Sequence, residues 1–68
     1  MPDPRAVPED EVRERLVALY VTEGFDPDNA SVCAAEVLEG PEGYPLTLEG
    51  AGLRWDGTAY LDTEGSQE

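Results

Sequence analysis

Carboxylates are the most abundant side chains in this sequence that could do chemistry. Sixteen Asp and Glu residues stand against four basic residues, and the formal net charge is -12. General acid–base catalysis needs one carboxyl group whose pKa is raised by burial, with a second carboxyl group nearby in a different environment. None of the sixteen falls where the apolar pattern predicts a core. We therefore expect the carboxylates to form a solvated surface.

A calcium loop is the metal site that the sequence suggests most directly. Asp26, Asp28 and Asn29 have the residue types that begin an EF-hand loop, but the pattern then needs Gly at its sixth position and Glu at its twelfth. Counted from Asp26, those positions hold Ser31 and Val37. Helix capping explains the same residues without a metal.

Nucleophilic and zinc chemistry also lack their usual partners. The chain has one Cys and no His, so it offers no ordinary zinc site and no nucleophile–base pair for a Ser or Thr hydroxyl. Cys33 falls on the predicted inward face of a helix, where a buried, unreactive thiol is expected. No Gly-rich phosphate loop is present. We expect no catalytic residue, no cofactor, no metal and no enzyme activity.

The charge also limits the partners. All four basic residues are Arg, and the acidic excess would repel nucleic acids and anionic membranes. A surface rich in Asp and Glu without Lys is typical of halophilic or high-GC organisms. The longest apolar run, LVALYV, is too short to cross a bilayer, and the N-terminus lacks the pattern of a secretory signal. The sequence predicts a soluble cytoplasmic protein.

Two helices are predicted after a loosely ordered arm at residues 1–7. Pro8 suits the first position of a helix over 8–22, and Gly24 followed by Phe25 predicts a Schellman-type stop. Pro27 suits the start of a second helix over 27–39, which Gly40 and Pro41 end. Apolar residues at helical spacing give each helix one face, and we expect the two helices to form a hairpin.

Three strands are predicted next, over 45–49, 52–55 and 58–62. Asp56-Gly57 is a strong signal for a two-residue type I′ turn, which would pair Trp55 with Thr58. Gly50-Ala51 suits a type II′ turn. Read independently, the two turns place six side chains on one face, the predicted core side: Leu46, Leu48, Leu53, Trp55, Thr58 and Tyr60.

The predicted fold class is therefore α+β, with a two-helix hairpin packed on a three-stranded antiparallel meander in the order ααβββ. Residues 8–62 form a single small domain in this interpretation. Residues 63–68 form an acidic tail without apolar anchors, which we expect to be disordered.

An edge strand is the docking device that a small sheet offers most readily. Ala59 and Leu61 would point outward from strand 58–62, and Arg54 would lie on the same outer face. Homodimerisation or strand addition through 58–62 is one hypothesis. The alternative is that a single exposed Leu has no function.

Two hypotheses of function remain open. The first is a small non-catalytic regulatory protein whose acidic surface binds a protein partner with a basic surface. The second is an acidic decoy, for example phage-encoded, that mimics nucleic acid and blocks a basic nucleic-acid-binding protein. Acidic residues occur in both predicted helices, in the turns and in two of the three predicted strands, whereas a mimic must concentrate its charge on one face. This distribution favours the first hypothesis.

Overall fold

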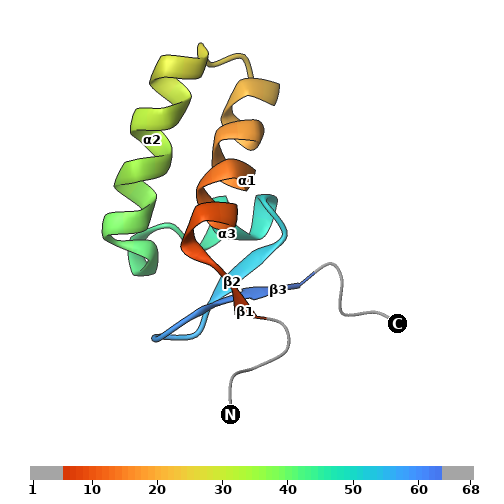
Figure 1. Ribbon diagram of the computed structural model, residues 1–68, viewed down its shortest axis with the longest axis vertical. Coiled ribbons are helices and arrows are strands. Elements are labelled where there is room, and N and C mark those ends of the chain that lie inside the picture. Colours follow the sequence, from red (N-terminus) through yellow and green to blue (C-terminus); the bar gives the residue numbers. More distant parts are fainter. Residues whose placement is uncertain (1–5, 64–68) are drawn as a thin grey trace.

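The computed structural model describes residues 6–63, and its largest part is a helical hairpin (Figure 1). Helix α2 spans Pro27–Glu39, as the sequence predicts, and helix α1 spans Glu9–Thr22. Helix α1 begins one residue later than predicted, because Pro8 has extended backbone and is its N-cap. Pro27 takes the first turn of α2. Asp26 occupies the N-cap position, although its side chain makes no capping hydrogen bond. Within residues 6–63, no helix combines the length and the apolar character needed to cross a bilayer.

The predicted stop after α1 is confirmed. Gly24 has a φ of 106°, in the left-handed region that favours glycine. Its N–H donates to the Val21 carbonyl, and the N–H of Phe25 donates to the Tyr20 carbonyl, each at 3.0 Å. These are the two hydrogen bonds of a Schellman motif. The ring of Phe25 lies 5.2 Å from that of Tyr20 and supplies the accompanying apolar contact.

The prediction of a strand over 45–49 is wrong. After a short 3-10 turn, η1, at Pro41–Gly43, residues Pro45–Gly50 form helix α3. Pro45 takes the first turn, and the Leu48 N–H donates to the Tyr44 carbonyl at 3.1 Å. Leucines two residues apart share one face of a strand, but they point to nearly opposite sides of a helix. Leu48 is accordingly 1% exposed, whereas Leu46 is 79% exposed.

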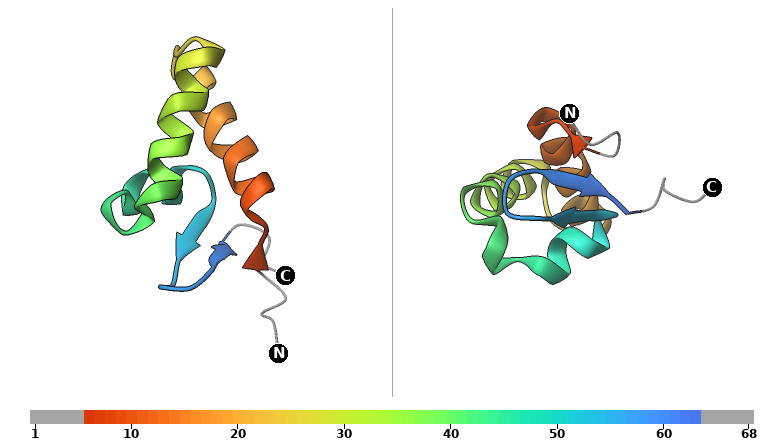
Figure 2. Two further views of the ribbon diagram at one scale, coloured as in Figure 1. Left: turned by 60° about the vertical axis from the view of Figure 1, so that its left-hand side comes forward. Right: turned by 90° about the horizontal axis from the view of Figure 1, so that it is seen from below.

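The three-stranded antiparallel sheet is confirmed, but one of its strands comes from elsewhere. Strand β1 is Ala6–Val7, β2 is Leu53–Trp55 and β3 is Tyr60–Asp62. Their order is β1-β3-β2 (Figures 1 and 2). Ala6 and Val7 therefore belong to the sheet and not to the predicted arm. The rest of the arm, 1–5, and the tail after Thr63 lie outside the described residues.

The predicted hairpin between β2 and β3 is present with a wider loop. Trp55 pairs with Tyr60 and not with Thr58, so the loop contains four residues, 56–59. Its fixed point is the Asp56 carboxylate, whose Oδ1 accepts the N–H groups of Thr58 and Ala59, each at 2.9 Å. The same oxygen accepts the Thr58 hydroxyl at 3.2 Å. The Asp56 carboxylate thus satisfies the N–H groups of Thr58 and Ala59, which have no strand partner in the wider loop.

One core joins the helices to the sheet, which confirms the α+β class. Its buried members come from α1, α2, α3, β2 and β3: Val12, Leu16, Ala34, Val37, Leu48, Leu53 and Tyr60. Of the side chains predicted on the core face, Trp55 is half-buried and packs against this cluster. Thr58 is exposed, because it lies in the loop.

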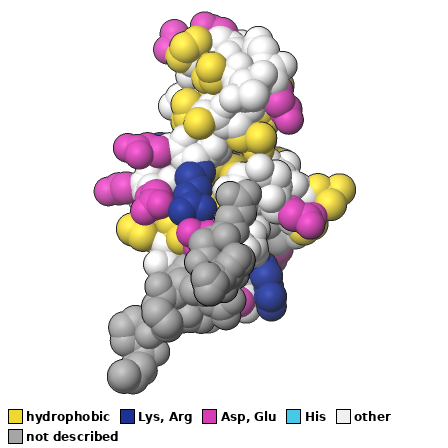
Figure 3. Space-filling view, turned by 90° about the vertical axis from the view of Figure 1, so that its right-hand side faces the viewer, with side chains coloured by type: hydrophobic (Ala, Val, Ile, Leu, Met, Phe, Trp, Pro, Cys, Tyr) yellow, Lys and Arg dark blue, Asp and Glu magenta, His cyan; other side chains and the backbone are white. Residues whose placement is uncertain are grey.

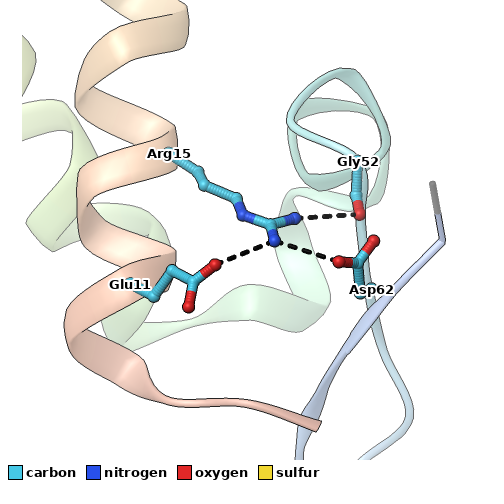
Figure 4. A network of polar contacts seen from close by, with 4 residues as sticks. All are labelled: Glu11, Arg15, Gly52 and Asp62. Atoms are coloured by element: carbon cyan, nitrogen blue, oxygen red, sulfur yellow. Dashed lines mark hydrogen bonds and ion pairs between the residues drawn. The ribbon is translucent and has the colours of Figure 1, made fainter. Parts of the chain in front are cut away.

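A polar network holds the sheet against the first helix (Figure 4). One nitrogen of Arg15, on α1, lies 2.9 Å from the Glu11 carboxylate and 3.0 Å from the Asp62 carboxylate at the end of β3. The other donates a longer bond, 3.5 Å, to the Gly52 carbonyl just before β2. The hydrogen bond with Asp62 is the main reason why the pKa of Arg15 is raised. The network fixes the end of the sheet opposite the 56–59 loop.

A matched pair of leucine substitutions tests α3. Leu48→Ala is expected to lower the free energy of unfolding by about 2–5 kcal/mol, because it empties a fully buried site. Leu46→Ala should change it by less than about 0.5 kcal/mol, because that side chain is exposed. Urea unfolding followed by circular dichroism measures both. Similar losses at the two positions would indicate a strand.

The loop should respond to acid through Asp56. Hydrogen bonds from Thr58 and then Ala59 lower the pKa of this carboxyl group in the folded chain. A lowered pKa means that the stabilisation is complete above the ordinary carboxyl pKa and is lost as the pH falls through the folded value. The amide resonances of Thr58 and Ala59 should therefore shift at that acidic step, and Asp56→Asn should remove the shift. An Asp56 pKa at or above the ordinary value would contradict this geometry.

Candidate functional site

A groove runs along strand β2, between that strand and the segment η1–α3. Its volume is about 490 Å³. All three residues of β2, Leu53, Arg54 and Trp55, line it. Side chains alternate between the two faces of a strand, so three consecutive residues can border one cavity only where it follows the strand edge. We name it the edge groove, and its other lining residues are Pro41, Glu42, Pro45, Leu48, Glu49 and Thr63.

A second cavity of about 410 Å³ adjoins the edge groove at Trp55. The two share Pro41, Glu42 and Trp55. We name it the acidic hollow, and its lining is completed by Glu9, Leu38, Glu39, Gly40 and Tyr60. Its residues come from the start of α1, the end of α2, η1 and the hairpin. The fold therefore brings together positions that are far apart in the sequence.

Two aromatic rings form part of the hollow. The centroids of Trp55 and Tyr60 lie 4.7 Å apart with their planes inclined by 52°. Burial, and then the nearby Glu9 carboxylate, raise the pKa of the Tyr60 phenol. The phenol is therefore uncharged at neutral pH. The pair presents aromatic surface next to carboxylates, an arrangement that favours a cation.

Trp55 also contains an unbonded donor. Its indole Nε1 is buried and has no hydrogen-bond partner among residues 6–63. An unsatisfied buried donor costs about 1–3 kcal/mol, and such groups are rare in folded proteins. Trp55, whose indole N–H is unsatisfied, lines both the edge groove and the acidic hollow.

The carboxylates of the hollow come from three different elements, α1, α2 and η1. Glu9, Glu39 and Glu42 are exposed, and none of the residues lining the hollow is Lys or Arg. Among residues 6–63, no three His, Cys, Asp or Glu side chains are grouped so that they could hold a metal ion. The hollow therefore has a concentrated negative potential without an internal counter-charge. Among the residues that line the two cavities, Arg54 in the edge groove is the one basic residue.

The three predicted partner-binding residues are not brought together. Strand β3 lies between β1 and β2, so the prediction that 58–62 is a free edge is wrong. Leu61 is only 9% exposed and pairs with Ala6 on one side and Arg54 on the other. Ala59 is half-buried in the hairpin loop. Arg54 is exposed on β2 and lines the edge groove.

Sequence reasoning missed the residues that form the acidic hollow. Trp55 and Tyr60 were predicted only as core, and the glutamates only as solvated surface. A usable signal was the proline and glutamate sequence GPEG, 40–43, directly after a helix that ends in glutamate. Where this segment lies relative to the hairpin depends on α3, which the sequence pattern did not reveal.

Neutralising one carboxylate of the hollow should stabilise the chain. Glu39 is the last residue of α2, at the negative end of the helix dipole, and faces the same cavity as Glu9 and Glu42. Glu39→Gln is expected to raise the free energy of unfolding by about 0.5–1 kcal/mol at low salt. The matched control, Glu14→Gln in the middle of α1, should give a smaller change. If the gain did not shrink with added salt, charge repulsion would not be its cause.

No family model, no curated protein and no solved structure matches this chain. Its function must therefore be inferred from its own geometry and charge.

Proposed function

We propose that this chain is a small, acidic, non-catalytic interaction protein that binds a basic surface on a protein partner. The observation that carries the proposal is the acidic hollow. Three glutamates, from α1, α2 and η1, line this cavity together with two aromatic rings, and no Lys or Arg is among its lining residues.

A cationic side chain fits this combination on two grounds. Carboxylates attract it, and the faces of Trp and Tyr attract it further, by about 0.5–2 kcal/mol depending on desolvation. A Lys or Arg on a flexible stem can also bury its methylene groups against an apolar surface such as Leu38 and Pro41, both half-buried in the lining. The edge groove beside it supplies the apolar area that a protein interface needs.

The lining residues support a binding role over a catalytic one. The two cavities contain no His, Cys or Ser side chain. The four glutamates that line them, Glu9, Glu39, Glu42 and Glu49, are all exposed. General acid–base catalysis by a carboxyl group depends on burial that these four exposed positions do not provide.

The decoy hypothesis receives less support from the distribution of charge. Acidic residues lie on α1, α2, η1, α3 and β3. On the face shown in Figure 3, they form separate groups with white and yellow surface between them. A nucleic-acid mimic needs a continuous acidic row. The halophilic or high-GC source and the cytoplasmic location stay predictions.

Selection from a library of displayed random peptides at about 0.15 M salt tests the proposal. Three proteins are compared: the unchanged chain, the site variant Glu9→Gln/Glu39→Gln/Glu42→Gln, and a control variant Asp28→Asn/Glu14→Gln/Glu36→Gln. Both variants lose three charges, and the control positions are exposed and outside the two cavities. Circular dichroism establishes that each variant is folded.

Peptides rich in Lys or Arg should be enriched on the unchanged chain and on the control. Affinity for the site variant should fall about threefold to a hundredfold, the range for three exposed charge pairs. Failure to enrich any basic peptide would overturn the proposed function. Equal enrichment on all three proteins would show that the acidic hollow is not the binding site. If only DNA-binding domains displaced the bound peptide, and other basic proteins did not, the result would favour the decoy hypothesis.

A further inference from the structure

We propose that the acidic hollow selects an arginine of the partner over a lysine. The arginine's guanidinium group lies flat against the Trp55 ring, and its N–H groups face the glutamates of the lining. A lysine at the same place makes a charge contact without the flat stacking. This inference rests on the proposed function and names the residue type that the site recognises.

Trp55 is the aromatic ring of the hollow that an incoming side chain can reach. It is half-buried, whereas Tyr60, in the same lining, is only 8% exposed. The two rings are in contact, with centroids 4.7 Å apart, so a cation has no space between them. It must contact Trp55 from the cavity side. Among aromatic side chains, Trp attracts cations most strongly.

The unsatisfied indole N–H lowers the cost of covering this ring. Nε1 of Trp55 is buried without a partner among residues 6–63, so this donor has already lost its water in the free chain. A side chain that lies over the indole therefore dehydrates no further polar atom of Trp55. Leu38 and Pro41, half-buried in the same lining, offer apolar contact to the methylene stem of a long cationic side chain.

The placement of the carboxylates favours a guanidinium over an ammonium group. Glu9, Glu39 and Glu42 come from three elements and are all exposed. Exposed ion pairs contribute little by themselves, and an ammonium is compact and strongly hydrated. A guanidinium is more weakly hydrated, and its five N–H donors lie in one plane. When that plane rests on the indole, the donors point outward, toward carboxylates at the sides of the cavity.

The arginines that the structure describes do not fill the hollow themselves. Arg15 is held by Glu11 and Asp62. Arg54 is next to Trp55 in β2, but alternation along the strand directs the two side chains to opposite faces, and only Trp55 lines the hollow. Arg13 is exposed and absent from the lining. Within residues 6–63, the place against Trp55 is left to a side chain from a partner.

An NMR titration of the unchanged chain at low salt tests the inference with three blocked peptides. They are acetyl-Gly-Arg-Gly-amide, its Lys analogue, and its citrulline analogue, which has nearly the shape of Arg without the charge. The chain has one Trp, so a single indole N–H resonance reports on the hollow. The Arg peptide should shift this resonance and bind at least about threefold more tightly than the Lys peptide. The citrulline peptide should bind at least about threefold more weakly than the Arg peptide.

Stacking also has a signature on the peptide that a charge contact alone lacks. The ring current of the indole should move the δ-methylene protons of the bound Arg upfield. This shift is measured on the unchanged chain, so it does not depend on the folding of a variant. Trp55→Leu, once circular dichroism shows that it is folded, should remove the preference for Arg over Lys. The control variant Asp28→Asn/Glu14→Gln/Glu36→Gln should keep that preference.

The outcomes separate this inference from the proposed function. Equal affinity for the Arg and Lys peptides, or Arg binding without the upfield shift, would overturn the inference and leave the proposed function standing. Citrulline binding equal to that of Arg would also overturn it, because the charge would then be irrelevant. In the display selection, the enriched peptides should contain more Arg relative to Lys than the starting library does. Failure of all basic peptides in both experiments would remove the proposed function as well.

Discussion

The hydrogen bonds of a single carboxylate fix the arrangement on which the candidate site depends. Asp56 accepts two backbone N–H groups and one hydroxyl, and this favours a four-residue loop over a two-residue turn. The wider loop sets Trp55 opposite Tyr60. In the narrower hairpin, Trp55 would instead form the hydrogen-bonded pair next to the turn, and its backbone groups would point toward β3. The register thus determines which residues form the aromatic pair of the acidic hollow.

The helices supply the remaining lining residues of the two cavities beside the hairpin. Helix α3 covers the core with Leu48, and its residues Pro45, Leu48 and Glu49 line the edge groove. The Arg15 network holds the opposite end of the sheet against α1. The end near Trp55 therefore remains open, with only η1 and the helix termini beside it. Those termini contribute glutamates and not basic residues, so the opening is negative.

The fold was predictable where a local signal has one structural meaning. The Pro starts and the Gly24 stop determine the helical hairpin, because few conformations satisfy those residues. The helix at 45–50 was not predictable, because two leucines two residues apart also fit a strand when the segment is this short. Packing against the core decides that Leu48 is buried and Leu46 is exposed. The acidic hollow depends on tertiary placement of Glu9, Glu39 and Glu42, which no local pattern encodes.

The pairing register of β2 and β3 is the most direct measurement of the central claim. Proton NOE spectra of the free chain report which Hα atoms face each other, because non-hydrogen-bonded pairs bring Cα atoms to about 4.5 Å. The structure predicts strong Hα–Hα cross-peaks between Leu53 and Asp62 and between Trp55 and Tyr60. A cross-peak between Arg54 and Ala59 in their place would indicate the two-residue turn. It would contradict the pairing of Trp55 with Tyr60 and the site built on that pair.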